Sequence, residues 1–205
     1  MRKSDFVQAI DLHMHTKYSG DAKITPRELV DQLHAHLFIK GVAITDHDSI
    51  KGYQEVSKLA KAYEDILIIP GIEVSVENGH LIILGVEECP THPSSIERVI
   101  DFSKERDGIV VIPHPYRELG IGDTSEDIEA DAIEILNPHA TQEENKKAED
   151  LARRINLPSV AGSDAHSLQE MWLAYTKVDA KQEVDDILKA IKNGRVKVAS
   201  TKIAV

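Results

Sequence analysis

Several kinds of residue and segment are scarce in this sequence, and each absence disfavours a class of protein. The 205 residues include a single cysteine, Cys89, and one thiol forms no intrachain disulfide, which favours a reducing cytoplasm. No apolar run approaches the roughly 20 residues that a membrane-spanning helix needs, and the opening residues MRKSDFVQAID lack the long apolar region of a signal peptide. Lys and Arg number 24 against 35 Asp and Glu, for a formal net charge of -11. This balance disfavours a protein that coats nucleic acids, and we expect a cytoplasmic protein.

The residues that are present are typical of one folded α/β domain. Hydrophobic residues make up 41% and charged residues 29% of the chain, which is a globular composition. We find no internal repeat, low-complexity segment or linker, so residues 1–205 are interpreted as a single domain. Short runs rich in Val and Ile predict strands at 7–12, 41–45, 66–70, 80–86, 109–112, 132–136 and 159–162, with one or two more at 175–178 and 195–199.

Amphipathic segments lie between these runs. Capping boxes, in which a Ser or Thr is followed three residues later by Glu, predict helix starts at Thr25, Ser94 and Thr141. A further helix is predicted over 49–63, and a last one is predicted to stop at Asn193-Gly194. The alternation of strands and helices favours a parallel barrel or a doubly wound sheet.

Side chains that bind metals follow five of the predicted strands. In chain order they are His13 and His15, His47, Glu73, His114, and Asp164 with His166. In a parallel barrel the C-terminal ends of all strands lie on one face, where loops build the active site. His80 opens a strand instead, and an antiparallel excursion would bring it to the same rim.

These residue types suit a transition-metal site. His, Asp and Glu together bind Zn²⁺, Mn²⁺ or Fe²⁺, and residues i and i+2 of an extended chain point the same way. His13 with His15, and Asp164 with His166, can therefore each grip one ion. A single pair of this kind is more often a surface feature, but repeated clusters at successive strand ends favour a metal site.

The motifs DLHMHT, TDHD, GIE, HP and SDAH, in this order, resemble those of the PHP (polymerase and histidinol phosphatase) family of metal-dependent phosphoesterases. The resemblance runs from Asp11 to His166 and covers most of the chain. The segment TPREL followed by GVAITDHDSIKGY is similar to the small PHP phosphoesterases that include nucleoside 3',5'-bisphosphate phosphatases. The resemblance implies a distorted TIM-like (β/α)7 barrel that holds metal ions.

The resemblance further implies two or three divalent ions (Mn²⁺, Zn²⁺ or Fe) and a set of ligands for each. The sets are His13, His15, Glu73 and Asp164 for one ion, Glu73, His80 and His114 for a second, and Asp21, His47 and His166 for a third. The loop that carries Asp21 is one residue longer than the commoner SDG loop of the family. Asp46 is expected as a ligand or as the partner of one.

A phosphoesterase mechanism follows from the same resemblance, with a hydroxide bridging two ions as the nucleophile. Glu73 and Asp164 would be catalytic through the ions, and Arg117 is either a phosphate clamp or part of a surface salt bridge. The expected substrate is a phosphate monoester of a nucleotide or small metabolite. The alternatives are a 5'-3' exonuclease or phosphodiesterase on short oligonucleotides, a histidinol-phosphatase-like activity, and a non-catalytic metal-binding module. A cyclic amidohydrolase is disfavoured because no strand end offers a metal-bridging lysine.

Other polar residues are placed outside the ligand set. Asn137 and His139 follow a predicted strand and could line the pocket. The residues expected on the surface, in turns or in packing contacts are His34, His36, His92 and Cys89.

Overall fold

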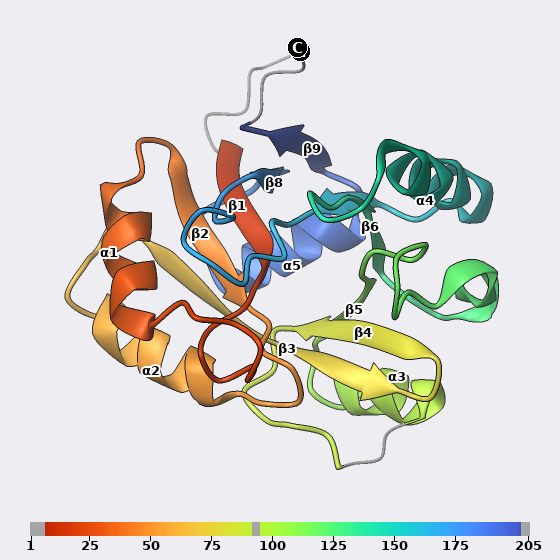
Figure 1. Ribbon diagram of the computed structural model, residues 1–205, viewed down its shortest axis with the longest axis horizontal. Coiled ribbons are helices and arrows are strands. Elements are labelled where there is room, and N and C mark those ends of the chain that lie inside the picture. Colours follow the sequence, from red (N-terminus) through yellow and green to blue (C-terminus); the bar gives the residue numbers. More distant parts are fainter. Residues whose placement is uncertain (1–6, 92–94, 202–205) are drawn as a thin grey trace.

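The strands of the computed structural model form one mixed sheet. The structure describes residues 7–91 and 95–201. Within them the strands are β1 (Val7–Met14), β2 (Ile39–Ile44), β3 (Leu67–Val76), β4 (Gly79–Leu84), β5 (Ile109–Ile112), β6 (Ala132–Leu136), β7 (Ser159–Ala161), β8 (Ala174–Asp179) and β9 (Val196–Ser200). Their order across the sheet is β7-β6-β5-β4-β3-β2-β1-β8-β9. The sheet curls into a nearly closed barrel (Figure 1), which confirms the predicted α/β barrel.

Strand direction departs from a regular succession of βα units. The strands β1, β2 and β3 are parallel, as are β5, β6 and β7, but β4 runs antiparallel to both of its neighbours and β8 and β9 are also antiparallel. The β3–β4 hairpin confirms the expected excursion and pairs His80 with Ser75. Its ladder also extends β3 to Val76, so Glu73 lies within the strand rather than after it.

The edge strand β7 comes against β1 where the chain leaves β7. The Asp164 N–H donates to the His13 carbonyl at 2.8 Å, and the His15 N–H donates to the Ala165 carbonyl at 3.2 Å. A Cβ atom on Gly162 would lie 2.3 Å from the Cβ of His13, so only glycine permits this approach. The closure therefore places the ends of β1 and β7 side by side.

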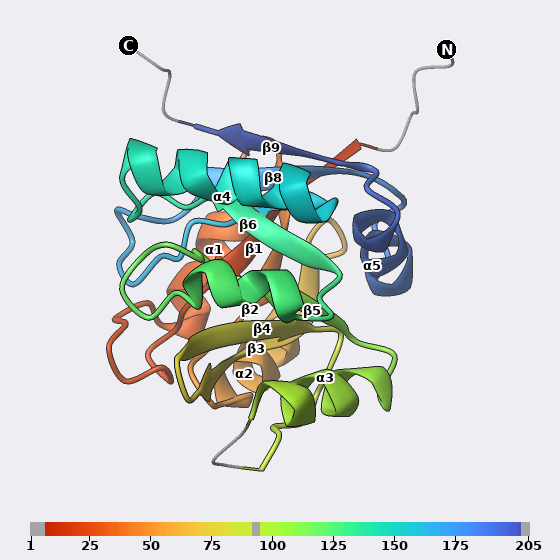
Figure 2. The same ribbon diagram turned by 90° about the vertical axis from the view of Figure 1, so that its right-hand side faces the viewer.

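Helices lie around the barrel and close one of its ends (Figure 2). They are α1 (Pro26–Ala35), α2 (Lys51–Ala60), α3 (Ile96–Lys104), the 3₁₀ helix η1 (Gly122–Asp127), α4 (Gln142–Ile155) and α5 (Val184–Lys192). The capping boxes at Thr25 and Thr141 are confirmed. The start predicted at Ser94 is wrong by one residue, because Ser95 accepts the N–H of Arg98 and caps α3; Ser94 itself lies outside the described residues.

Two further features of the fold bear on the predictions. The helix α2 is shorter than the predicted span of 49–63, since Ile50 precedes it and offers no side-chain cap. In the described part of the chain, no helix is long and apolar enough to cross a membrane.

Aliphatic side chains of the strands, such as Ile10, Leu12 and Ile82, form one core with Ile187 and Ile191 of α5. Polar side chains are left to gather at the rim where β1 and β7 end.

Candidate metal centre

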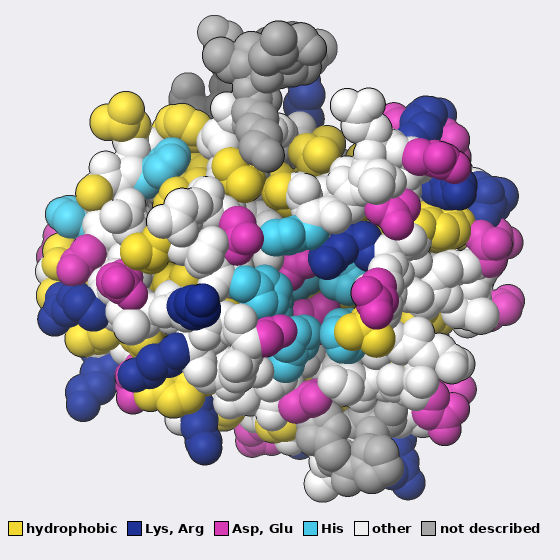
Figure 3. Space-filling model, viewed as in Figure 1, with side chains coloured by type: hydrophobic (Ala, Val, Ile, Leu, Met, Phe, Trp, Pro, Cys, Tyr) yellow, Lys and Arg dark blue, Asp and Glu magenta, His cyan; other side chains and the backbone are white. Residues whose placement is uncertain are grey.

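The side chains predicted as ligands meet at one rim of the barrel. Histidine side chains surround a hollow in the surface, with acidic side chains inside it and a basic side chain at its edge (Figure 3). Each predicted ligand lies within 3.5 Å of another member of the set, and the structure thus brings together His13, His15, Asp21, His47, Glu73, His80, His114, Asp164 and His166.

Four donor atoms lie close together. They come from β1 and the residue just after it, from β3, and from the loop after β7. Nε2 of His13 and Nε2 of His15 lie 3.1 Å apart. Oε2 of Glu73 lies 3.3 and 3.2 Å from these two nitrogens, and Oδ1 of Asp164 lies at the same distances, 3.3 and 3.2 Å. Imidazole nitrogens and carboxylate oxygens are the donors that Zn²⁺ and related ions bind. The chemistry of this group and the closeness of its donors therefore fit a divalent ion.

Glu73 faces two groups of donors with its two oxygens. Its Oε1 lies 3.1 Å from Nδ1 of His80 and 3.2 Å from Nε2 of His114. Its Oε2 belongs to the group of four donors and also lies 3.2 Å from Nδ1 of His47. A carboxylate that divides its oxygens in this way is placed to bridge two ions.

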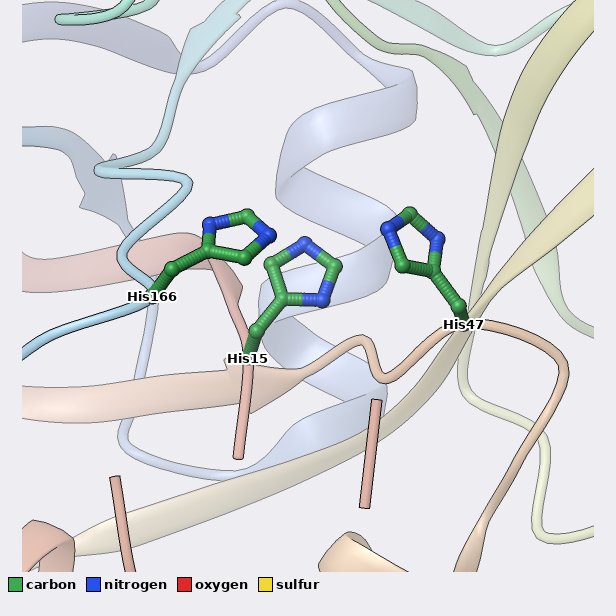
Figure 4. A group of neighbouring side chains, drawn as sticks. All are labelled: His15, His47 and His166. Atoms are coloured by element: carbon green, nitrogen blue, oxygen red, sulfur yellow. The ribbon is translucent and has the colours of Figure 1, made fainter. Parts of the chain in front are cut away.

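A third group consists of His15, His47 and His166, whose rings lie beside one another (Figure 4). Oδ2 of Asp21 lies 3.5 Å from Nε2 of His47 and 3.3 Å from Nε2 of His166. The longer loop still delivers Asp21 because the Lys23 N–H bonds to the His166 carbonyl at 2.8 Å and fixes the loop beside the site. The side chain of Asp21 is 53% exposed, which makes this the most open of the three groups.

Neighbouring groups hold the rings in the orientation that a metal needs. Nδ1 of His15 lies 2.7 Å from Oγ of Ser19, and Nδ1 of His166 lies 2.8 Å from the Asp164 carbonyl. A hydrogen on Nδ1 leaves the Nε2 lone pair facing the site. The Ser19 hydroxyl in turn donates to Oδ1 of Asp46 at 3.2 Å. Asp46 therefore supports His15 through Ser19.

Burial and charge oppose each other at the centre. Burial by itself would raise the pKa of Glu73, but His13, His114 and His15 hold that pKa well below its usual value. The pKa of Asp164 is likewise held low against burial, by His13 and His15. Burial would lower the pKa of His15, whereas hydrogen bonds to Asp164 and Glu73 raise it to about 9. The carboxylates thus favour positive charge here, which protons or divalent ions can provide.

His47 behaves differently from His15. Burial lowers the pKa of His47 below its ordinary value, which favours the neutral ring. Its Nδ1 is buried without a hydrogen-bond partner, although Oε2 of Glu73 lies only 3.2 Å away. A neutral imidazole with an unpartnered nitrogen is a metal donor. The chemistry of this residue therefore fits a cation between the rings.

Glu134 is a member of the rim that the sequence did not reveal as functional. It lies in β6 and is 3% exposed. Its oxygens accept from Nδ1 of His13 at 3.2 Å, from the His114 N–H at 3.0 Å and from Nδ2 of Asn137 at 2.9 Å. Asn137 also donates to Oδ2 of Asp164 at 3.1 Å, so it faces the pocket as expected. The acid in the middle of the apolar run AIEIL was the available signal.

Arg117 lies beside the centre and not in a distant surface pair. Its Nη1 donates to Oδ2 of Asp164 at 2.5 Å, and its side chain is 27% exposed. His139 approaches His166 and Glu170 at the same rim.

The other histidines and the cysteine lie apart from the centre. His34 pairs with Asp65 at 2.8 Å on the surface, and the ring of His36 accepts a backbone N–H at 2.9 Å. The thiol of Cys89 lies 3.4 Å from two backbone carbonyls. His92 lies outside the described residues.

Comparison with known proteins identifies the family. A family model described as PHP-associated matches residues 142–196, which include Asp164 and His166. The uncharacterized protein MJ1587 of Methanocaldococcus jannaschii is 34% identical over 140 residues, which are 63% of this chain and 81% of that protein. The chain belongs to the PHP family. MJ0417, an uncharacterized protein of the same organism, is 28% identical over 179 residues, or 82% of this PHP chain and 69% of its relative.

Solved structures share the fold of this PHP protein. A candidate metal-dependent phosphoesterase of Bifidobacterium adolescentis has a TM-score of 0.63 and 19% identity, with 78% of this chain and 88% of that chain covered. An amidohydrolase of Chromobacterium violaceum, solved with bound sulfate and no metal, has a TM-score of 0.64, 21% identity and the same coverage, 78% and 88%. PsfC of Pseudomonas syringae has a TM-score of 0.70 at 16% identity, with 96% and 92% covered.

Proposed function

We propose that this PHP protein is a metal-dependent phosphoesterase that hydrolyses a phosphate monoester of a nucleotide or small metabolite. The observation that carries the proposal is the group of four donor atoms on His13, His15, Glu73 and Asp164, in which each histidine nitrogen lies 3.1 to 3.3 Å from the other three donors. Glu73 joins this group to the donors of His80. Groups that share a carboxylate favour two or three divalent ions, for which Mn²⁺, Zn²⁺ and Fe are suited by the mixture of imidazole and carboxylate ligands.

The ions would provide a water activated at neutral pH and positive charge towards the phosphate oxygens. The residues of the chain hold that charge in place. Their three carboxylates do not neutralise three divalent ions, so the site would stay positive although the chain has a net charge of -11. An anionic substrate would be drawn to this rim and not to the acidic surface around it.

Arg117 is suited to orient the phosphate. One of its N–H groups bonds to Asp164, and the guanidinium has five in a planar fork that matches phosphate oxygens. Its side chain is partly exposed beside the donor groups. Two structures with the same fold support a phosphate subsite: one is assigned as a candidate phosphoesterase, and the other holds sulfate, an anion with the shape of phosphate.

The test is phosphate release by the Mn²⁺-loaded protein, with and without chelator. The substrates are a nucleoside 3',5'-bisphosphate, histidinol phosphate, an aryl phosphate monoester and an aryl diester. We expect chelator-sensitive release from a monoester. Preference for the diester would instead support a phosphodiesterase, and no turnover by protein shown to hold its ions would contradict the proposal.

A pair of matched variants ties the activity to the centre. Asp164→Asn removes a carboxylate from the group of four donors and should abolish turnover together with ion binding. Asp31→Asn changes the same functional group at an exposed position, where Asp31 pairs with Arg27 on α1, and should leave turnover unchanged. Full activity in the Asp164 variant would refute the role given to that carboxylate.

A further inference from the structure

Glu134 is a buried carboxylate whose position the ligand set does not explain. It lies between Ile133 and Ile135 in the middle of β6, and its side chain is only 2% exposed. A charged group in such surroundings is stable only when hydrogen bonds replace the water that it has lost. Its hydrogen-bond donors belong to three different segments that lead to the metal centre.

We infer that Glu134 is a positioning residue that fixes ligands of two neighbouring ions at once. The inference rests on the proposed metal centre. Oε1 of Glu134 lies 3.2 Å from Nδ1 of His13. Because a carboxylate only accepts, Glu134 holds the hydrogen of a metal-binding His13 ring on Nδ1. The lone pair of Nε2 then faces the donors of Glu73 and Asp164, as metal binding requires.

The second oxygen of Glu134 acts on other ligands. It accepts the His114 N–H at 3.0 Å, and His114 has φ 25°, a backbone conformation that a residue with a side chain adopts only when it is held there. It also accepts Nδ2 of Asn137 at 2.9 Å, and the same amide nitrogen donates to Oδ2 of Asp164 at 3.1 Å.

One carboxylate is thereby connected to ligands on both sides of Glu73. His13 lies beside Oε2 of Glu73 and belongs with Asp164 to the group of four donors, whereas His114 contacts Oε1 of Glu73. The third group, which includes His47, has no contact with Glu134 among the hydrogen bonds and ion pairs of the described residues. The effect of Glu134 should therefore be confined to the ions that Glu73 joins.

The test is Zn²⁺ binding by the full chain carrying Glu134→Gln, measured by competition with a chromophoric chelator. Gln keeps the size of the side chain. Its amide N–H group, however, would face one of the N–H groups that Glu134 accepts. We expect the tightest Zn²⁺ site to weaken by about 10–100-fold, the usual effect of losing such a partner of a metal-bound histidine. Glu87→Gln is the control. Glu87 accepts the Tyr53 hydroxyl at 2.8 Å and has no hydrogen bond or ion pair with a ligand among the described residues, so this variant should bind Zn²⁺ as the unmodified protein does.

Nitrogen-15 NMR of the histidines in the unmodified, Zn²⁺-loaded protein gives a second measurement that does not depend on how the variant folds. We expect His13 to carry hydrogen on Nδ1 and zinc on Nε2, and zinc on Nδ1 would overturn the inference. Equal Zn²⁺ affinity in the folded Glu134→Gln variant would overturn it as well while leaving the proposed function intact. An unmodified protein that binds no divalent ion would refute the metal centre itself, and this inference with it.

Discussion

Replacing Thr176 by Val should show how much the closure of the barrel contributes to stability. Thr176 is fully buried in β8, and its hydroxyl accepts the N–H of Ala161 in β7 at 2.8 Å and donates to the carbonyl of the same residue at 2.9 Å. Val has nearly the same shape but no hydroxyl, so two buried backbone groups lose their partner. At about 1–3 kcal/mol for each such group, the free energy of unfolding should fall by about 2–6 kcal/mol.

Urea unfolding in the presence of chelator measures this change without a contribution from bound ions. Thr176→Ser is the matched control, since it keeps the hydroxyl and removes one methyl group, at a cost of about 1 kcal/mol. The Val variant should also bind Zn²⁺ more weakly, because β7 leads directly to Asp164 and His166. A Val variant as stable as the Ser variant would refute the claim that this hydroxyl joins β7 to β8.

Two further predictions concern the centre itself. Zn²⁺ binding should release protons at pH 7 and tighten as the pH rises towards 9. Burial lowers the pKa of His15, but hydrogen bonds to Asp164 and Glu73 outweigh it and raise that pKa to about 9. A proton on His15 therefore competes with the ion at neutral pH. Calorimetry in two buffers of different ionisation enthalpy measures this release, and its absence at pH 7 would contradict the reasoning. Arg117→Gln should lower kcat/KM for a monoester by about 10–100-fold, the effect of losing one charged hydrogen bond, with bound metal unchanged. Metal loss in that variant would show instead that Arg117 mainly supports Asp164.

Local patterns predicted the parts of the fold that depend on near neighbours in sequence. The capping boxes at Thr25 and Thr141 are satisfied within four residues, so the sequence contains all that they need. His13 and His15 share a direction because alternate side chains of a strand do. The convergence of the strand ends followed from the parallel runs that were predicted, and these runs are present on both sides of β4.

Other features depend on which strands become neighbours, and the sequence holds no local trace of that. Glu134 reaches His13 only because β6 and β1 lie at the same rim of the closed barrel, 121 residues apart in sequence. The extension of β3 around Glu73 arises from its pairing with β4. The extra residue before Asp21 did not predict where its carboxylate lies. Backbone hydrogen bonds close this loop, such as the 2.8 Å bond from the Lys17 N–H to the Ile24 carbonyl.

The rim is held in the form that metal binding needs by the protein's own hydrogen bonds. Three ligand rings have Nδ1 engaged by a neighbour, namely Glu134 for His13, Ser19 for His15 and a backbone carbonyl for His166. Asp164 and His114 also adopt positive φ values, 50° and 25°, at a cost of about 1–3 kcal/mol each. Such strain persists only where surrounding contacts over-determine the backbone. Hydrogen bonds from Arg117 and Asn137 therefore hold Asp164 in its strained conformation, and the bond to Glu134 holds His114 in the same way. The donor atoms are thus aligned before an ion binds.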